Sequence, residues 1–168
     1  GQPLVRTIFQ SMDGSIWIGS EGILARLNPK TEEVLLYRYS TSAAQDNAIG
    51  KLPSYSVNAI AETKEGNILV GFLEDGLYLL NPLNHKFKKI PYVTPEICDS
   101  QNSLVADVSV DDSDRVWVAT YSGLFMYDLV NENSKRYDGE DAMSNKTIWK
   151  ILNVDENQIW MATDIGIS

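Results

Sequence analysis

The sequence is poor in the residues that build catalytic and metal sites. Its 168 residues include one cysteine and one histidine. A single cysteine forms no disulfide within the chain, which argues against a disulfide-stapled secreted module and fits the cytoplasm or the periplasm. One histidine and one cysteine exclude the usual zinc ligand sets, and nothing in the sequence supports a Ser-His-Asp set around that histidine. We therefore expect no metal, no cofactor and no catalytic residue in this segment.

Positive charge and long apolar runs are also scarce. Lys and Arg number 14 against 23 Asp and Glu, which gives a formal net charge of -9. This excess of negative charge disfavours binding to nucleic acid or to an anionic membrane surface. No segment approaches the apolar run of about 18 residues that a membrane helix needs, and the amino terminus lacks the features of a signal peptide. We expect no direct membrane contact by this segment.

What the sequence does contain is one pattern that occurs four times. Each copy has a leading aliphatic residue, an acidic turn, an apolar-Trp-apolar-small-polar segment, a glycine and a second apolar run. Successive copies lie 52, 48 and 43 residues apart, within the range of propeller-blade repeats. In every copy the leading aliphatic residue stands twelve residues before the Trp or Leu position; the pairs are Val5 and Trp17, Val57 and Leu69, Val105 and Trp117, and Ile148 and Trp160.

Each copy has the pattern of short strands joined by turns. The apolar runs are rich in Val, Ile, Trp and Tyr, and acidic-Gly pairs such as Asp13-Gly14 predict tight hairpins between them. Asn28-Pro29 and its counterparts precede a weaker fourth strand. The sequence therefore predicts an all-β fold, a β-propeller fragment of four-stranded antiparallel blades. The expected blades are blade 1 at residues 4–39, blade 2 at 57–90, blade 3 at 104–137 and an incomplete blade 4 at 148–168.

Two other architectures compete with this prediction. A solenoid with repeats of this length is usually helical, and these segments lack the i, i+3, i+4 apolar spacing of helices. A β-sandwich would give strands without a phased internal repeat. The spacing therefore favours a propeller. Because closed propellers typically have four to eight blades, we expect these three and a half blades to be part of a longer chain.

The strand order of a propeller blade sorts its loops onto two rims. If each blade runs from the inside out, the connectors between blades and the loops between second and third strands share one rim, here called the connector rim. The hairpins between first and second strands and the Asn-Pro turns share the other, here called the hairpin rim. The longest connector, residues 40–56, is longer than most loops and therefore functional or mobile. We expect ligands to bind at the connector rim.

Aromatic residues outside the phase of the repeat are the candidates for ligand stacking. Trp17, Trp117 and Trp160 recur at one strand position, which indicates packing between blades. Other aromatic residues lie at or beside the connector rim, with polar residues near them that could bond hydroxyl groups. Ordinary loop packing is the alternative for each. The expected ligand-binding residues are Tyr55, Phe72, Glu74, Asp75, Tyr121, Ser122, Lys146 and Trp149.

Two further features are predicted to be turns. His85, in Asn84-His85-Lys86, lies beside a turn, where such residues are common. The run Asp111-Asp112-Ser113-Asp114 invites a calcium hypothesis. However, it lacks the glycine and the distal glutamate of the helix-loop-helix calcium pattern, and it aligns with the first hairpin. We expect a plain turn at both places.

Once aligned, the copies resemble the two-component regulator propeller repeat. That family's pattern is an aliphatic strand, Asp-x-x-Gly or a near variant, Leu/Ile-Trp-Ile/Val-Gly-Thr, and then Gly-x-Leu-x-x-Tyr/Phe. Met12–Ser20 and Val116–Thr120 carry the central part, and Met143–Ile148 resembles the segment that opens each repeat. Four residues depart from the pattern and predict different packing between blades; they are Leu69, Phe72, Ala119 and Ala162.

The resemblance implies the periplasmic sensor region of a hybrid two-component histidine kinase and response regulator of the Bacteroidetes type. In that family, seven-bladed propellers precede an immunoglobulin-like domain and a membrane helix, so the resemblance implies a seven-bladed parent. Such receptors are often linked to polysaccharide use. The implied function is extracytoplasmic sensing of an oligosaccharide or another small polar ligand, with the signal passing to a cytoplasmic kinase outside this segment.

Two other functions remain open at the level of sequence. One is a non-catalytic propeller scaffold for protein-protein interaction or receptor dimerisation. The other is a propeller lyase, which the single histidine disfavours, because lyases resembling this fold use histidine and acidic residues with a metal. A partial propeller also leaves apolar blade faces uncovered, and large exposed apolar patches promote association. We therefore expect self-association.

Overall fold

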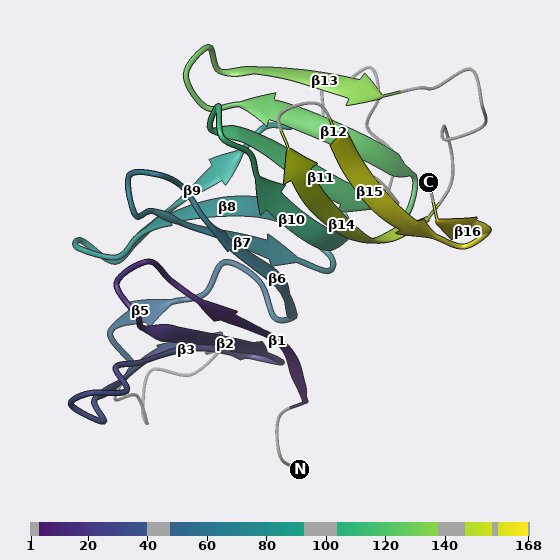
Figure 1. The fold of residues 1–168 in the computed structure, drawn as a ribbon. Helices are drawn as coiled ribbons and strands as arrows, with labels where there is room; N and C mark the ends of the chain where they lie inside the picture. Colours follow the sequence, from purple (N-terminus) through teal and green to yellow (C-terminus); the bar gives the residue numbers. More distant parts are fainter. Residues whose placement is uncertain (1–3, 40–47, 93–103, 138–146, 156–157, 168) are drawn as a thin grey trace.

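The computed structural model describes residues 4–39, 48–92, 104–137, 147–155 and 158–167. Over these residues the secondary structure is β-strand, without helices. Accordingly, no helix in the described ranges is long and apolar enough to cross a membrane. The strands form four small sheets that lie side by side in chain order (Figure 1). The prediction of an all-β, propeller-like set of blades is confirmed.

Each sheet is one blade, and the strands follow one another across it in sequence order. Blade 1 consists of β1 (Val5–Gln10), β2 (Ile16–Ser20), β3 (Ile23–Leu27), β4 (Val34–Arg38) and β5 (Gly50–Lys51). Blade 2 consists of β6 (Val57–Glu62), β7 (Ile68–Phe72), β8 (Gly76–Asn81) and β9 (Lys86–Ile90). Blade 3 consists of β10 (Val105–Val110), β11 (Arg115–Thr120), β12 (Gly123–Asp128) and β13 (Asn133–Tyr137). Blade 4 consists of β14 (Ile148–Asp155), β15 (Gln158–Thr163) and β16 (Gly166–Ile167).

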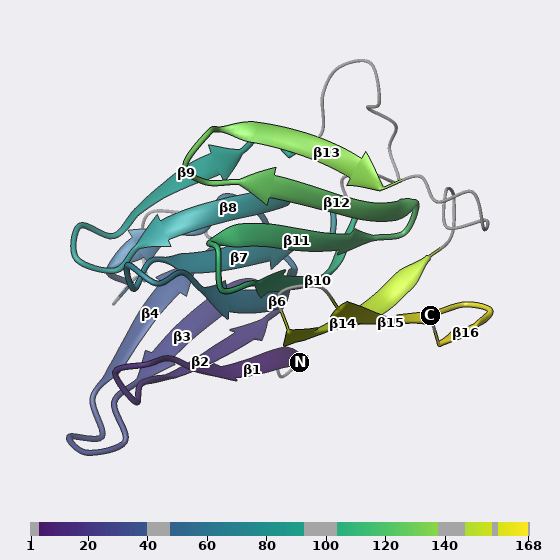
Figure 2. The same cartoon turned by 45° about the horizontal axis from the view of Figure 1, so that its top comes forward.

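The blades run from the inside outward. The first strands β1, β6, β10 and β14 contact one another in series, and β4, β9 and β13 lie at the periphery (Figure 2). Neighbouring strands within a blade are antiparallel from the first to the fourth. The loops therefore sort onto the two expected rims, because each reversal of direction moves the chain to the opposite end of the sheet.

Blade 1 has a fifth strand that the sequence pattern does not predict. Gly50 and Lys51, inside the long connector, pair in parallel with Tyr37 and Arg38 of β4, and Leu52 is buried. A side chain at residue 50 would place its Cβ 2.7 Å from the Tyr37 ring. Glycine is therefore the residue that lets this short strand lie against β4.

The core consists of one apolar cluster at each joint between successive blades. Trp17 of blade 1 packs with Val57 and other residues of blade 2, and Trp117 of blade 3 packs with residues of blade 4. Their side chains are buried, in agreement with the predicted packing between blades. Trp160 differs, because it is 52% exposed. The same repeat position is open to solvent on blade 4, since no further blade covers it in the part of the chain that the structure describes.

Candidate functional site

The connector rim has a repeated backbone irregularity at its inner edge. The register between the first and second strands shifts at the second residue of each innermost strand. Such bulges bend a strand and change the direction of a side chain, and they are frequent near functional sites. The four bulged residues are Arg6, Asn58, Ala106 and Trp149. Each blade therefore carries one bulged residue at the same repeat position on this rim.

Three of these bulged side chains contact neighbouring residues of the rim. Arg6 forms an ion pair with Glu21, with Nη2 and Oε1 2.8 Å apart. The Nδ2 of Asn58 donates to the carbonyl oxygen of Val105 at 2.8 Å, which ties blade 2 to the first residue of the next innermost strand. Trp149 instead lies against an aromatic ring. In blades 1 and 2 the bulged side chain thus stabilises the rim through a polar contact. In blade 4 it is an exposed aromatic side chain.

Tyr121 and Trp149 form an aromatic pair at the joint between blades 3 and 4. Their ring centroids are 5.3 Å apart, at an interplanar angle of 61°. Trp149 is 48% exposed and Tyr121 is half-buried. The hydroxyl of Thr147 donates to the carbonyl oxygen of Tyr121 at 3.3 Å, which holds the start of blade 4 beside the β11–β12 loop. The structure thereby brings two of the predicted residues together as one partly exposed surface.

Tyr39 and Tyr55 form a second aromatic pair at the joint between blades 1 and 2. Their centroids are 5.8 Å apart and the rings are nearly perpendicular. Gly22 holds both residues in place, since its N–H donates to the Tyr55 carbonyl at 2.7 Å and its carbonyl accepts from the Tyr39 N–H at 2.9 Å. Its φ of 73° is one that glycine adopts readily. Tyr39 was not among the predicted residues. Its position directly after the fourth strand and before the long connector could have placed it on this rim.

Asp75 is engaged by neighbouring side chains of blade 2. Its carboxylate accepts from Lys89 Nζ at 2.7 Å and from the Tyr78 hydroxyl at 2.7 Å. Burial and the hydrogen bond to Asp75 raise the pKa of Tyr78, and the hydrogen bond to Asp75 raises the pKa of Lys89. The adjacent Glu74 is exposed. A ligand would therefore bond Glu74 directly, whereas it would have to displace Lys89 or Tyr78 to bond Asp75.

Two of the predicted binding residues, Phe72 and Ser122, are buried, so the structure does not present their side chains to a ligand. Phe72 is fully buried and packs edge-on against Tyr78, with centroids 5.5 Å apart. The alternation of β7 turns its ring into the core, because blade 1 covers that side of the strand. Ser122 is also buried, and its carbonyl accepts from Arg136 at 3.0 Å. Lys146 lies outside the described residues. For the other five, ligand binding stays a prediction.

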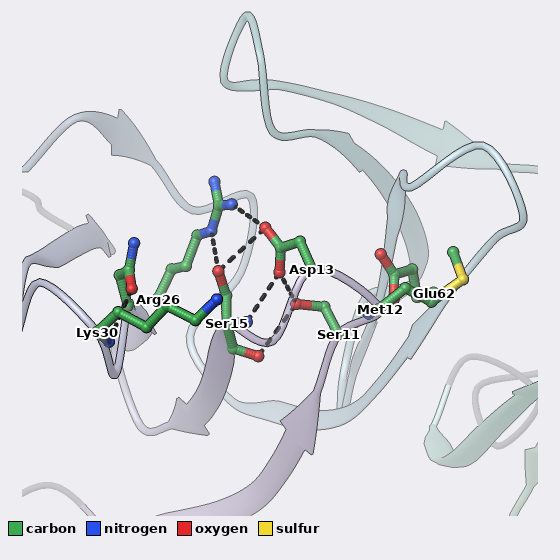
Figure 3. Close-up of polar contacts among 8 residues, drawn as sticks. Ser11, Met12, Asp13, Ser15, Arg26, Lys30 and Glu62 are labelled. Carbon is green, nitrogen blue, oxygen red and sulfur yellow. Dashed lines mark hydrogen bonds and ion pairs between the residues drawn. The ribbon is translucent and has the colours of Figure 1, made fainter.

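The hairpin rim is organised by polar side chains that close its turns. Asp13 accepts from the Ser11 hydroxyl at 2.6 Å, from the Ser15 N–H at 2.8 Å and from Arg26 Nη2 at 2.5 Å (Figure 3). These contacts, first the bond from Ser11 and then the one from Ser15, hold the pKa of Asp13 well below its usual value. The first hairpin is thus a closed network, with Asp13 at its centre.

The acidic run of blade 3 is a turn of the same kind. Asp111 accepts from the N–H groups of Ser113 and Arg115 at 2.9 and 3.0 Å, and from Trp117 Nε1 at 2.9 Å. Burial alone would raise the pKa of Asp111, but the bond from Trp117 and the others outweigh it and lower that pKa. Asp114 takes the positive φ that Gly14 takes in blade 1. The carboxylate of Asp111 is therefore committed to the turn, as the sequence predicted.

The single histidine lies at the joint between blades 1 and 2. His85 has a φ of 59° in the β8–β9 turn, and its Nδ1 is 2.9 Å from the hydroxyl of Tyr37. Burial raises the pKa of Tyr37 to about 12. His85 thus connects a turn of blade 2 to the outermost strand of blade 1 and does not lie on the connector rim.

The hairpin rim has hollows between its described residues. One of about 430 Å³ is at the ends of β1, β6 and β10. Its polar groups are partly engaged, since Glu62 accepts from the Met12 N–H at 2.6 Å and Lys64 Nζ donates to the Asp112 carbonyl. Another, of about 360 Å³, lies between blades 2 and 3, and a smaller one of about 120 Å³ adjoins Ser15 and Asn28 of blade 1. The exposed aromatic pairs lie on the rim opposite these hollows.

Solved structures resemble the chain in fold. The extracellular domain assigned to a one-component system of B. thetaiotaomicron superposes with a TM-score of 0.69 at 21% identity, over 98% of this chain and 21% of that one. The extracellular domain assigned to a hybrid two-component system of the same organism gives 0.72 at 16% identity, over 100% of this chain and 24% of that one. Virginiamycin B lyase from Staphylococcus aureus gives 0.63 at 15% identity, over 98% and 54%.

These matches concern three-dimensional structure. No protein-family model matches the chain, and no curated protein matches it. The chain spans between a fifth and a quarter of the two extracellular domains. At such identities the likeness establishes architecture and leaves activity to be argued from the site. The chain folds as successive blades of a β-propeller.

Proposed function

We propose that the chain is the ligand-recognition propeller of an extracytoplasmic sensor, and that it binds an oligosaccharide or another small polar ligand at its connector rim. In a longer parent protein the signal would pass to a cytoplasmic kinase, and the propeller would lie in the periplasm. The structural likeness to extracellular domains of one-component and hybrid two-component systems supports this proposal. This likeness favours ligand binding over catalysis as the role of the propeller.

The observation that carries the proposal is the Tyr121–Trp149 pair. The half-exposed Trp149, with the Tyr121 ring inclined to it at 61°, offers an aromatic face, and aromatic faces with a few polar groups nearby are typical of small-molecule sites. Sugars present apolar C–H faces together with hydroxyl groups. Trp149 would stack on such a face, and exposed polar groups of the rim would bond the hydroxyls. Tyr39 and Tyr55 provide an equivalent surface at another joint.

The position of the pair at a joint supplies a mechanism for signalling. Tyr121 belongs to blade 3 and Trp149 to blade 4, so one ligand in contact with both rings would depend on the spacing of the two blades. A ligand shifts a conformational equilibrium only if it binds the two states with different affinity. A ligand bound across the joint would have different affinities for two blade spacings, because a change in spacing would separate the two rings.

Calorimetric titration with a panel of oligosaccharides tests the proposal. We expect one sugar class to bind, and we expect Trp149→Ala to weaken that binding by about two- to tenfold, since aromatic contacts contribute about 0.5–1.5 kcal/mol. Binding should be accompanied by a change in tryptophan fluorescence that Trp149→Ala removes. The matched control is Val130→Ala, which truncates an exposed side chain on the opposite rim.

The possible results separate the proposal from its rivals. Binding that Trp149→Ala leaves unchanged would place the site elsewhere and contradict the role of the pair. No heat with any sugar, while a protein partner is captured through the same rim, would favour the non-catalytic scaffold for protein-protein interaction or receptor dimerisation. That scaffold has one observation in its favour, because exposed aromatic residues are also enriched in protein interfaces.

We also propose that this segment is not an enzyme. The fold is shared with virginiamycin B lyase, so the architecture permits catalysis. His85, however, is bonded to the buried Tyr37, and in the described ranges no three His, Cys, Asp or Glu side chains are grouped to hold a metal ion. An assay for ring opening of a streptogramin-type lactone, with and without divalent metal, should give no turnover above background.

A further inference from the structure

The hollow of about 360 Å³ between blades 2 and 3 occupies space that aromatic rings fill at the preceding joint. Between blades 1 and 2, the ring centroid of Tyr37 is 6.2 Å from that of Trp17 and 5.7 Å from that of Phe87. The strand registers place smaller residues at the same repeat positions of the next joint. These residues are Leu69 for Trp17, Ile90 for Tyr37 and Ser134 for Phe87.

Both blades that form this hollow lie inside the row. Blade 2 packs on blade 1 with its other face, and blade 3 packs on blade 4. Further blades of a longer chain would join the row beyond blade 1 or beyond blade 4. The hollow is therefore a property of this joint and of its side chains.

The hollow is lined by a buried tyrosine whose hydroxyl is unused. Tyr127 is 3% exposed, and its hydroxyl has no hydrogen-bond partner in the part of the chain that the structure describes. Blade 2 has the fully buried Leu80 at this repeat position, so the fold requires only an apolar side chain there. An unpaired buried polar group costs free energy. A ligand atom in the hollow would supply the missing partner.

The walls of the hollow are predominantly acidic. Its charged side chains are the carboxylates of Glu65, Asp114 and Glu132 and the ammonium of Lys88. Lys88 Nζ is 3.1 Å from Glu132 Oε1, but both side chains are largely exposed, and such pairs contribute little. A ligand cation could therefore displace Lys88 from Glu132. Burial, followed by the charge of Glu132, raises the pKa of Tyr127, as expected if the hydroxyl lies close to that carboxylate.

The arrangement of these carboxylates suits an organic cation better than a metal ion. In the described ranges, no three His, Cys, Asp or Glu side chains are grouped to hold a metal. The carboxylates instead surround apolar side chains, those of Leu79, Ile90 and Leu129. A ligand that satisfies both features has a positive charge and an apolar body.

We propose that the hollow between blades 2 and 3 binds a small organic ammonium ion that carries an apolar chain or ring. The apolar body lies on Leu79, Ile90 and Leu129, and the ammonium group lies among the carboxylates. Tyr127 forms a hydrogen bond with the ammonium through its hydroxyl. The hollow has the size of small-molecule sites. This inference does not rest on the proposed sensing function, because the hollow lies on the rim opposite Trp149.

Nuclear magnetic resonance titration with n-hexylammonium tests the proposal. We expect shifts in the methyl resonances of Leu79, Ile90 and Leu129, with a dissociation constant of about 1 mM or lower, in the range open to so small a ligand. The matched probes are 1-hexanol, which lacks the charge, and hexanoate, which reverses it. Both should bind at least about fivefold more weakly. Added salt should weaken the binding of hexylammonium, because the carboxylates are accessible to screening.

Two single variants separate the hydroxyl from the charge. Tyr127→Phe should weaken the binding of hexylammonium about two- to tenfold and leave the thermal midpoint unchanged or higher, because no hydrogen bond within the chain is lost. Glu132→Gln should weaken the binding of hexylammonium and leave that of 1-hexanol unchanged. Glu74→Gln, which neutralises an exposed carboxylate on the connector rim, is the control and should bind like wild type.

A double variant closes the hollow. Ile90→Tyr with Glu132→His places at this joint the pair that fills the preceding one, where Tyr37 and His85 are in contact, and it should abolish binding. Circular dichroism checks its fold, and the two single variants decide the matter if it does not fold.

Three results would overturn the proposal. The first is equal affinity for hexylammonium and 1-hexanol. The second is a set of shifts confined to the connector rim, or shifts that persist unweakened in both single variants. The third is tighter binding of Nα-acetyl-lysine amide than of hexylammonium, which would assign the hollow to a lysine side chain of a protein partner and not to a small ligand.

Discussion

At the scale of single residues, this fold depends on side chains that accept hydrogen bonds in the turns, where backbone N–H groups lack backbone acceptors. Asp13 accepts hydrogen bonds from two serines and an arginine. In the corresponding turn of blade 3, Asp111 accepts from the N–H groups of Ser113 and Arg115. Asn28 and Asn81 each accept from two backbone N–H groups in the turns before the fourth strand. Acidic and amide residues are favoured in turns for this reason.

The first prediction concerns stability in acid. Because the folded-state pKa of Asp13 is depressed, its contribution is fully present above the unfolded pKa of about 4 and is lost as pH falls through the folded value. Asp13→Asn should lower the free energy of unfolding at pH 7 by about 0.5–1.5 kcal/mol, a modest amount because the side chain is half-exposed. Urea unfolding at pH 7 and pH 3 measures this.

The difference between wild type and Asp13→Asn should shrink from pH 7 to pH 3. Other carboxylates titrate over the same range in both proteins, so the difference isolates Asp13. Glu74→Gln, which neutralises an exposed carboxylate, is the control and should follow the wild-type curve. A gap that stays constant with pH would show that Asp13 contributes through packing and not through its charge.

The second prediction concerns stability in base. Burial raises the pKa of Tyr37 to about 12, while an unfolded tyrosine titrates near 10. Its contribution is therefore complete below pH 10 and is lost as pH rises from 10 to 12. Tyr37→Phe should cost about 1 kcal/mol at pH 8 through loss of the contact with His85, and it should reduce the steepness of alkaline unfolding.

Chemical unfolding between pH 8 and pH 11 checks this behaviour. Tyr39→Phe changes an exposed tyrosine and serves as the control. Burial also raises the pKa values of Tyr78 and Tyr127, so part of the alkaline dependence should remain in Tyr37→Phe. An unchanged alkaline slope would mean that Tyr37 ionises in the folded protein as easily as in the unfolded one.

At the scale of structural elements, stability resides in the contact of one blade with the next. The side chains of a blade alternate between two neighbours, so a position on β7 either faces blade 1 or faces blade 3. Gly71 faces the innermost strand of blade 3, where Val105 fills the space. A blade interface of this kind requires a small residue on one side because the β-branched residue on the other has little freedom to move.

The third prediction is that Gly71→Ala destabilises the protein by about 1–3 kcal/mol, the usual range for overpacking. The added Cβ would lie 2.6 Å from Val105 and 3.2 Å from Ala59, so the two blades must separate slightly. Ala162→Val adds volume at the same repeat position on blade 4, where the residue is exposed, and should change stability by less than about 0.5 kcal/mol. Thermal unfolding of both variants at low protein concentration provides the comparison.

At the scale of the whole molecule, the structure is a row of similar units that contact their nearest neighbours. Stability in such proteins is close to a sum of unit and interface terms. Blade 2 has a neighbour on both sides, and every residue of β7 is buried. Blade 4 has one neighbour among the described residues, and β15 is largely accessible. Within this segment, local stability should therefore fall from blade 2 toward blade 4.

The fourth prediction is a gradient of amide hydrogen exchange. At low concentration, peptides of β7 should exchange at least about tenfold more slowly than peptides of β15 and β16, because local opening requires less free energy where fewer contacts are lost. Mass spectrometry of exchanged peptides measures the difference. Equal protection of β7 and β15 in the dilute protein would be incompatible with this account of stability.

The sequence by itself determined the repeating architecture. The twelve-residue spacing from leading aliphatic residue to Trp or Leu, the acidic turns and the glycines specify hairpins and strands locally, because alternation and turn chemistry act over a few residues. For the same reason the turn roles of Asp111 and His85 and the inter-blade packing of Trp17 and Trp117 could be predicted. Two of the candidate site residues, Tyr121 and Trp149, could also be placed on the correct rim from loop order alone.

Only the tertiary structure decided which of these residues are exposed. Phe72 and Trp149 are both aromatic residues near the connector rim, yet Phe72 is buried by blade 1 while a bulge leaves Trp149 half-exposed. Trp160 has the sequence signature of a core residue and lies in solvent. The reason is physical: a strand's own sequence sets which side a residue faces, but burial depends on whether another blade lies on that side.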